Sequence, residues 1–233
     1  LWKERRPICL AAGFFDGIHR GHQRVLAAAI GCAREMGGAA WVMTFDNHPL
    51  KVLRPPDAPL LLTSTTHKLQ ILERAGVDGC LVLRFTTALA AMSPVEFIDY
   101  LTGSSTTLSA IYAGANWRFG HRAGGDIGAL RRQLAPRGIA VTAVRQVCWR
   151  GQPVSSTRIR RAIGAGRLDD AAAMLGRPFS VVGRVVAGRR LGRQLGFPTA
   201  NIESCNEVHP PLGVYAVSAR VGRECHPGVL NYG

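Results

Sequence analysis

The sequence has very little lysine and no long apolar run. Lysine occurs only at Lys3, Lys51 and Lys68, so arginine carries nearly all of the positive charge. No apolar segment approaches the ~18 residues that a membrane-spanning helix needs, and residues 1–7 lack the apolar stretch of a secretory signal. The six cysteines form no C-x-x-C pair, which argues against a disulfide framework or a zinc site. We therefore expect a cytoplasmic protein with reduced thiols and no membrane partner.

The overall composition indicates a folded protein that binds anions. Hydrophobic residues make up 47% of the 233 residues, which is enough for a substantial core. The formal net charge is +14, and arginine binds phosphate or carboxylate groups through paired hydrogen bonds. Since no signature of a nucleic-acid-binding module is present, an anionic small molecule is the expected partner, and nucleic acid is not.

A glycine-punctuated turn stands out near the start of the chain. An apolar run at residues 8–12 predicts a buried strand, and apolar residues at helical spacing predict a helix over residues 23–36. The turn between them carries Gly13, Gly17 and Gly21, which allow close approach of a ligand to the backbone. His19 and His22 lie three residues apart at the helix start, where unpaired N–H groups favour phosphate. We expect both histidines to face that phosphate.

The remaining pattern predicts two regions of different architecture. Further strands are expected at residues 39–45, 80–85, 107–113 and 139–147, and further helices at 66–75, 93–101, 126–134, 156–163 and 168–175. This alternation is typical of an α/β fold with a parallel sheet, whose ligands gather at the carboxyl ends of the strands. After residue 178, apolar runs at 179–186, 213–221 and 228–230 predict antiparallel strands of a small barrel. The predicted domains are residues 1–176 and 177–233.

Two later motifs complete one predicted nucleotide site. Asn116 follows the strand at 107–113, and the run at 154–160 contains Ser155, Ser156, Thr157 and Arg158. The hydroxyl side chains can cap a helix start, and the Arg158 guanidinium can bind a phosphate with two nitrogens. No serine or cysteine nucleophile with a partner base stands out. The predicted chemistry is direct displacement at phosphorus, catalysed by positioning and charge neutralisation.

These motifs together resemble one family. The runs F-D-G-x-H-x-G-H, T-F-D-x-H-P, G-x-N-W-x-F-G and V-S-S-T-R-I-R, followed by G-R-x-L-G-F-P-T-A-N, are similar to the bacterial bifunctional riboflavin kinases/FMN adenylyltransferases, the FAD synthetase family. The similarity extends over essentially the whole chain in the family's order. H-x-G-H alone occurs in many nucleotidyltransferases, whereas the last run is much more specific.

The resemblance implies a Rossmann-like nucleotidyltransferase domain at residues 1–176. It would transfer AMP from ATP to FMN, giving FAD and pyrophosphate, with His19, His22 and Arg158 as catalytic residues. The implied ATP-binding residues are Gly13, Phe14, Phe15, Asp16, Gly17, His19, Gly21, His22, Asn116, Ser155, Ser156, Thr157 and Arg158. The implied flavin-binding residues are Asp46, Asn47, His48 and Pro49, with Asn47 where the family usually has proline.

The resemblance also implies that residues 177–233 open a riboflavin kinase domain with an antiparallel β-barrel. Its implied substrate-site residues are Gly188, Gly192, Arg193, Gly196, Phe197 and Pro198, and Thr199 and Asn201 would bind Mg²⁺. The family continues beyond the position of Gly233 and carries its expected catalytic glutamate there. We therefore expect a truncated kinase domain that does not phosphorylate riboflavin, with Glu203, Glu207 and Glu224 as surface residues.

Two alternatives stay open. A nucleotidyltransferase could use another phosphorylated acceptor, such as pantetheine phosphate or a polyol phosphate, although those enzymes lack the second set of motifs. A flavin-binding or nucleic-acid-binding protein without catalysis would also explain the net charge of +14.

Overall fold

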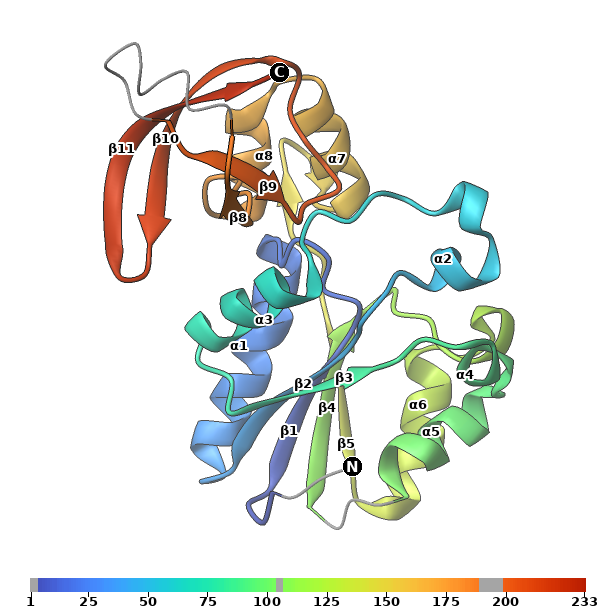
Figure 1. Cartoon of the computed structure of the whole chain (residues 1–233). Helices are drawn as coiled ribbons and strands as arrows, with labels where there is room; N and C mark the ends of the chain where they lie inside the picture. Colours follow the sequence, from blue (N-terminus) through green and yellow to red (C-terminus); the bar gives the residue numbers. More distant parts are fainter. Residues whose placement is uncertain (1–3, 104–106, 189–198) are drawn as a thin grey trace.

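A five-stranded parallel sheet forms the centre of the larger region. The structure is a computed structural model that describes residues 4–103, 107–188 and 199–233 (Figure 1). The strand order is β3-β2-β1-β4-β5, and every neighbouring pair is parallel. The strands are β1 (Ile8–Ala12), β2 (Ala39–Phe45), β3 (Gly79–Leu83), β4 (Leu108–Gly114) and β5 (Ala140–Val144). The predicted α/β class is confirmed, and the bounds of β1 and β2 agree with the prediction.

The central strand β1 contributes to two hydrophobic clusters on opposite faces of the sheet. Ile8 and Leu10 belong to one cluster, whereas Cys9 and Ala11 belong to the other. Successive side chains of a strand point to opposite faces, so a strand that is covered on both faces is apolar at every position. This explains why the sequence shows a continuous apolar run here.

Helices cover both faces of this sheet (Figure 1). One face carries α1 (Arg20–Glu35) and α3 (Thr65–Arg74), and the other carries α4 (Thr87–Ala91), α5 (Pro94–Thr102) and α6 (Ile127–Leu134). Helix α5 begins with a capping box, since the Ser93 side chain accepts from the Glu96 amide and the Glu96 side chain accepts from the Ser93 amide. The short helix α2 (Pro49–Leu53) and α4 were not predicted, because five residues show too little periodicity. The 3₁₀ turns are η1 (Pro55–Asp57), η2 (His121–Ala123) and η3 (Ala135–Arg137).

Helices α7 (Ser156–Gly164) and α8 (Leu168–Leu175) lie beside the segment that joins β1 to α1, since Ser156 donates to the Asp16 carbonyl and Gln23 donates to the Leu175 carbonyl. A short hairpin, β6 (Cys148–Trp149) with β7 (Gln152–Pro153), precedes them. Their buried residues form a third cluster, which includes Ile159 and Leu175 and also takes in Leu62 and Val208 from distant parts of the chain. The two regions of the chain therefore share a hydrophobic cluster.

The second region consists of short antiparallel pieces. Strand β8 (Gly183–Val186) pairs with β9 (Asn201–Ser204), and β10 (Gly213–Val221) pairs with β11 (Glu224–Tyr232). Antiparallel pairing was predicted, and the bounds of β10 agree. Strand β8 is shorter than the strand predicted at 179–186, and β11 is longer than the strand predicted at 228–230. Val214 and Val229 are more than 70% exposed, and within the described residues these pairs do not close into the expected barrel.

Candidate active site

The segment at residues 13–22, which we call the 13–22 turn, joins β1 to the first residues of α1 and holds an unusual backbone conformation. Phe15 has φ 55°, Gly17 has φ 78° and Ile18 has φ 39°. Positive φ is a genuine outlier for bulky or β-branched residues, and strain of this kind clusters at functional sites. The Phe15 and Ile18 side chains are fully buried, so packing holds the strained turn in place.

The two histidines lie face to face at the start of α1. Their ring centroids are 3.6 Å apart, and His19 is the N-cap residue whose Nδ1 accepts from the His22 amide at 3.4 Å. The Phe15 and His22 rings meet edge-on, with their centroids 5.2 Å apart. Nδ1 of His22 is buried without a hydrogen-bond partner among the described residues. A buried nitrogen in this state is available to pair with a water molecule or a bound ligand.

Burial makes both imidazoles neutral in the free protein. It lowers the pKa of His19 from 6.5 to about 4, with a smaller contribution from the Arg177 charge. Burial also lowers the pKa of His22 well below 6.5, and the charges of His19 and Lys68 lower it further. Both rings are therefore neutral hydrogen-bonding groups in the free protein.

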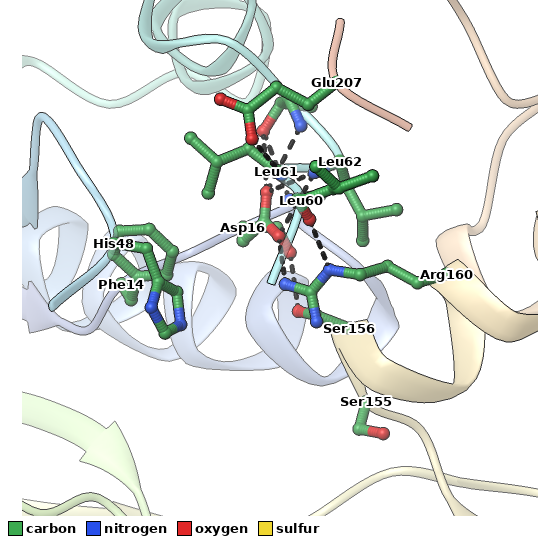
Figure 2. A network of polar contacts seen from close by, with 12 residues as sticks. Phe14, Asp16, His48, Leu60, Leu61, Leu62, Ser155, Ser156, Arg160 and Glu207 are labelled. Atoms are coloured by element: carbon green, nitrogen blue, oxygen red, sulfur yellow. Dashed lines mark hydrogen bonds and ion pairs between the residues drawn. The ribbon is translucent and has the colours of Figure 1, made fainter. Parts of the chain in front are cut away.

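Asp16 has a different environment from the one expected of an ATP ligand. Its side chain is 1% exposed and accepts hydrogen bonds from the amides of Leu62 (2.9 Å) and Thr63 (3.2 Å). It also forms an ion pair with Arg160, at 2.7 Å between carboxylate oxygen and guanidinium nitrogen. Figure 2 shows the carboxylate enclosed by these donors. The structure thus uses Asp16 to anchor the turn, because both buried oxygens already accept from protein donors.

The glycines of the turn admit protein side chains. A Cβ at Gly17 would lie 2.7 Å from the Leu62 side chain, and one at Gly21 would lie 3.1 Å from the His19 ring. Both contacts are tighter than a real Cβ permits without movement. At these two positions the absence of a Cβ lets Leu62 and His19 pack closely against the backbone, and the predicted approach of a ligand stays a prediction.

The start of α7 lies against the turn, as the motif spacing predicted. Ser155 is the N-cap and accepts from the Arg158 amide at 3.3 Å. The Ser156 hydroxyl donates to the Asp16 carbonyl at 2.9 Å. Thr157 is exposed. The run at 154–160 therefore contacts the turn through Ser156 and Arg160. Arg160 is not among the residues predicted for the site.

The Arg158 guanidinium binds carbonyl groups of the preceding hairpin. Nη1 donates to the carbonyls of Gln152 and Pro153, each at 2.8 Å, and Nη2 lies 3.4 Å from the Trp149 carbonyl. It also stands 5.7 Å from the Trp149 ring centroid. The predicted fork onto a phosphate would have to exchange these contacts for phosphate oxygens.

Asn116 lies at the carboxyl end of β4, on the same edge of the sheet as the 13–22 turn but apart from the contacts described above. It follows β4 and is exposed. It lines a polar cavity of about 280 Å³ together with Ala115, Arg118, Asp126, Ile127 and Gly128. Asp126 is the N-cap of α6 and is held by an ion pair with Arg118 at 3.5 Å. The cavity is large enough for a ring system and is open to hydrogen bonding.

The loop after β2, residues 46–49, is organised by its own side chains. The Asn47 side-chain oxygen accepts from the His48 amide at 2.9 Å, and His48 Nδ1 accepts from Leu50 at 3.1 Å as N-cap of α2. Pro49 is the first residue of α2, and the Phe14 ring meets the His48 ring edge-on at 4.9 Å. The predicted flavin loop and the 13–22 turn are therefore neighbours.

Lys68 is a central residue that sequence reasoning missed. It is 2% exposed, and its ammonium donates to the carbonyls of Phe14 (3.1 Å) and Phe45 (2.9 Å) and to the Thr44 hydroxyl (3.2 Å). Burial lowers its pKa from 10.5 to about 8. Lys68 therefore connects the ends of β1 and β2. The only signal in the sequence that could have pointed to it is that the chain has just three lysines.

The kinase-region residues are only partly described. Gly188, Thr199 and Asn201 are exposed at or next to β8 and β9. The predicted residues Gly192, Arg193, Gly196, Phe197 and Pro198 lie outside the described residues.

Of the three glutamates expected at the surface, Glu203 and Glu224 are exposed. Glu207 is not a simple surface residue, because its carboxylate contacts Lys51 Nζ and accepts from the Leu61 amide at 2.8 Å.

The part of the chain that the structure describes contains neither a cluster of metal ligands nor a membrane-spanning helix. Within residues 4–103, 107–188 and 199–233, no three His, Cys, Asp or Glu side chains gather as metal ligands would. In the same ranges, no helix combines the length and apolar character that a membrane crossing requires.

Comparison with known proteins identifies both regions of the chain. The FAD synthetase family matches residues 2–158, and the riboflavin kinase family matches residues 175–233. The bifunctional riboflavin kinase/FMN adenylyltransferase of Escherichia coli is 37% identical over 96% of this chain and 72% of its own length. The same enzyme of Listeria monocytogenes is 39% identical over 96% of this chain and 71% of its own length.

A solved structure has the same fold. A crystal structure described as the macrolide-efflux protein of Streptococcus pneumoniae superposes with a TM-score of 0.84 at 31% identity, covering 97% of this chain and 73% of that one. Because the family matches cover both regions in order and the relatives align over nearly the whole chain, this chain belongs to the FAD synthetase family of bifunctional riboflavin kinases/FMN adenylyltransferases.

Proposed function

We propose that the 13–22 turn and the start of α7 bind ATP, that the 46–49 loop binds FMN, and that this pair of loops transfers AMP to the FMN phosphate. The reaction follows from the family to which the chain belongs, and the roles of the individual residues are what we propose. The observation that carries it is the unpartnered, buried Nδ1 of His22 beside the N-terminus of a sixteen-residue helix. A phosphate oxygen at this place would pair that nitrogen and interact with the helix dipole.

The reaction needs positioning more than covalent chemistry. A phosphate oxygen of FMN attacks the α-phosphorus of ATP and forms the new P–O bond. The bond between the α-phosphorus and the bridging oxygen breaks, and its electron pair leaves with pyrophosphate. Catalysis of such an in-line displacement comes from holding the two groups together and stabilising the charge on the leaving group.

His19 and His22 are proposed to act on the departing pyrophosphate. In the free protein both rings are neutral, since burial lowers the pKa of each. A neutral imidazole donates one N–H, and an adjacent phosphate raises the pKa of the ring because it stabilises the protonated form. The buried ammonium of Lys68 adds a positive charge behind the turn, although its donors are directed to protein oxygens.

Arg158 and Asn116 are proposed to hold the nucleotide from the other side. Arg158 would bind phosphate by releasing the Gln152 and Pro153 carbonyls, a change that would loosen the β6–β7 hairpin. Asn116 needs no such exchange, since it is exposed at the rim of the 280 Å³ cavity. Asp16 is no longer proposed as an ATP ligand, because its buried carboxylate oxygens already accept from protein donors.

The domain boundary and the magnesium site of the second region are also proposals. Helix α8 ends at Leu175, and Gly176 terminates it with φ 74°, so we place the boundary between residues 176 and 177. Thr199 and Asn201 offer a hydroxyl and an amide oxygen, both on exposed residues. Such hard oxygen donors fit Mg²⁺, which keeps several waters and binds mainly through substrate phosphates. When bound, the ion would offset phosphate charge there.

The test is FAD formation from FMN and Mg²⁺-ATP, followed by chromatography of the flavins. His22→Ala should lower kcat by ~10²-fold with a much smaller change in the KM for ATP, since the proposed contact forms as pyrophosphate leaves. Near-normal turnover by His22→Ala would show that His22 is structural.

His67→Ala is the matched control. His67 is also buried and also has an Nδ1 without a partner among the described residues, but it lies on α3 outside the turn. His67→Ala should destabilise the protein about as much as His22→Ala does and leave kcat within about threefold of the wild-type value. An equal loss of kcat in both variants would contradict the role given to His22.

A further inference from the structure

A short segment, residues 60–63, lies between the 13–22 turn and the second region of the chain. We call it the 60–63 strip. On the side of the turn, Asp16 accepts from the amides of Leu62 and Thr63, and Arg160 donates to the Leu60 carbonyl at 2.6 Å. Figure 2 shows Leu60, Leu61 and Leu62 next to the Asp16 carboxylate. The conformation of the turn therefore depends on where the strip lies.

The second region holds the other side of the same strip. Glu207 accepts from the Leu61 amide at 2.8 Å, and the Asn206 amide donates to the Leu62 carbonyl at 3.2 Å. Asn206 is only 6% exposed, and its side-chain oxygen accepts from the Val182 amide. Val208 packs in the same hydrophobic cluster as Leu62. Residues 206–208 thus form a docked segment.

Leu62 connects the two sets of contacts directly. Its amide donates to Asp16 of the turn, and its carbonyl accepts from Asn206 of the second region. A shift of the strip would break buried hydrogen bonds on both sides at once, and an unmade buried hydrogen bond is costly because no water replaces it. The strip therefore transmits a displacement of residue 206 or 207 to the turn.

Glu207 has a second contact that points to the same site. Its other carboxylate oxygen pairs with Lys51 Nζ, and Lys51 lies in α2, which begins at the end of the proposed flavin loop. One carboxylate therefore contacts the elements behind both substrate loops. Glu207 itself belongs to the part of the chain that matches the riboflavin kinase family.

We propose that Glu207 and Asn206 are positioning residues for adenylyl transfer, supplied by the region that matches riboflavin kinase. This inference rests on the proposed function for its kinetic consequence. It gives the second region a role in the first region's reaction that is separate from any activity of its own. Glu207 touches no reacting group, so it acts through Leu61, Lys51 and the strip.

The experiment compares Glu207→Ala and Glu207→Gln with Glu203→Ala in the full chain. Glu203 is the matched control, because it lies four residues away on β9, and its ion pair with Arg184 is exposed on both sides. We expect Glu207→Ala to lower kcat/KM for FMN about tenfold, since misplaced substrate loops weaken alignment. Glu207→Gln should recover part of this loss, because its amide oxygen still accepts from Leu61. Glu203→Ala should match the wild type.

Hydrogen exchange gives a readout that does not depend on activity. Amides of both the 60–63 strip and the 13–22 turn should exchange faster in Glu207→Ala than in the wild type, and Glu203→Ala should leave both unchanged. Faster exchange of the strip alone, with the turn and kcat/KM unchanged, would overturn the proposal. So would a Glu207→Gln variant as impaired as Glu207→Ala.

The two hypotheses fail in different ways. If the wild-type chain makes no FAD, the proposed function fails, and the exchange measurement still decides whether residue 207 holds the turn. If the wild type makes FAD and Glu207→Ala behaves like Glu203→Ala in both assays, only the positioning role is refuted.

Discussion

Replacing Asp16 with asparagine separates the structural role of this residue from the ligand role that its motif predicted. Asp16 is 1% exposed, and Arg160, its ion-pair partner at 2.7 Å, has a side chain that is 16% exposed. Asparagine keeps the shape and can still accept from the Leu62 amide. It removes the negative charge and leaves the Arg160 guanidinium with the Leu60 carbonyl as its partner among the described residues.

The expected loss of stability is large. Removal of one partner of a buried ion pair costs about 3–5 kcal/mol, because the other charge is left uncompensated. The asparagine side chain would retain part of the hydrogen bonding, so we expect the lower end of that range, about 3 kcal/mol. For a chain of this size that corresponds to a fall in Tm of roughly 6–12 °C. Urea denaturation followed by circular dichroism measures it.

A double-mutant cycle makes the result decisive. Arg160→Met removes the guanidinium, and the Asp16→Asn/Arg160→Met pair should be destabilised by less than the sum of the single changes. A contrary outcome is an Asp16→Asn protein with wild-type stability and a raised KM for ATP. That result would restore the ligand role and refute the anchoring role.

Two further changes test the site. Since burial lowers the pKa of His19 from 6.5 to about 4, the unfolded chain gains protons first as the pH falls. Stability should therefore drop between about pH 6.5 and 4, by about 3 kcal/mol for this residue. Urea midpoints should fall over this range, and less so for His19→Gln; an equal fall would contradict the assignment. Asn47→Pro should change stability by less than about 1 kcal/mol, because a more restricted unfolded chain offsets the lost bond to the His48 amide. A marked rise in the KM for FMN would show that the Asn47 side chain is needed.

Local patterns along the chain were enough to predict the architecture of the first region. The continuous apolar run of β1 marks a strand that is covered on both faces, and the helical spacing of Val25, Leu26 and Ala29 marks the buried face of α1. The N-cap Ser155 was also predicted from the sequence, because a cap residue bonds an amide three residues away. These features are local, so periodicity and spacing suffice to find them.

The roles of the individual site residues depend on contacts between distant parts of the chain. Asp16, Arg160, Glu207 and Lys68 are polar residues whose role depends on partners up to 156 positions away, and spacing along the chain carries no record of such contacts. The neutral state of His19 has the same origin, since it follows from burial by distant segments. A motif specifies which chemical groups are present at a turn. Whether each one faces a ligand or holds the turn in place depends on the low-dielectric packing around it.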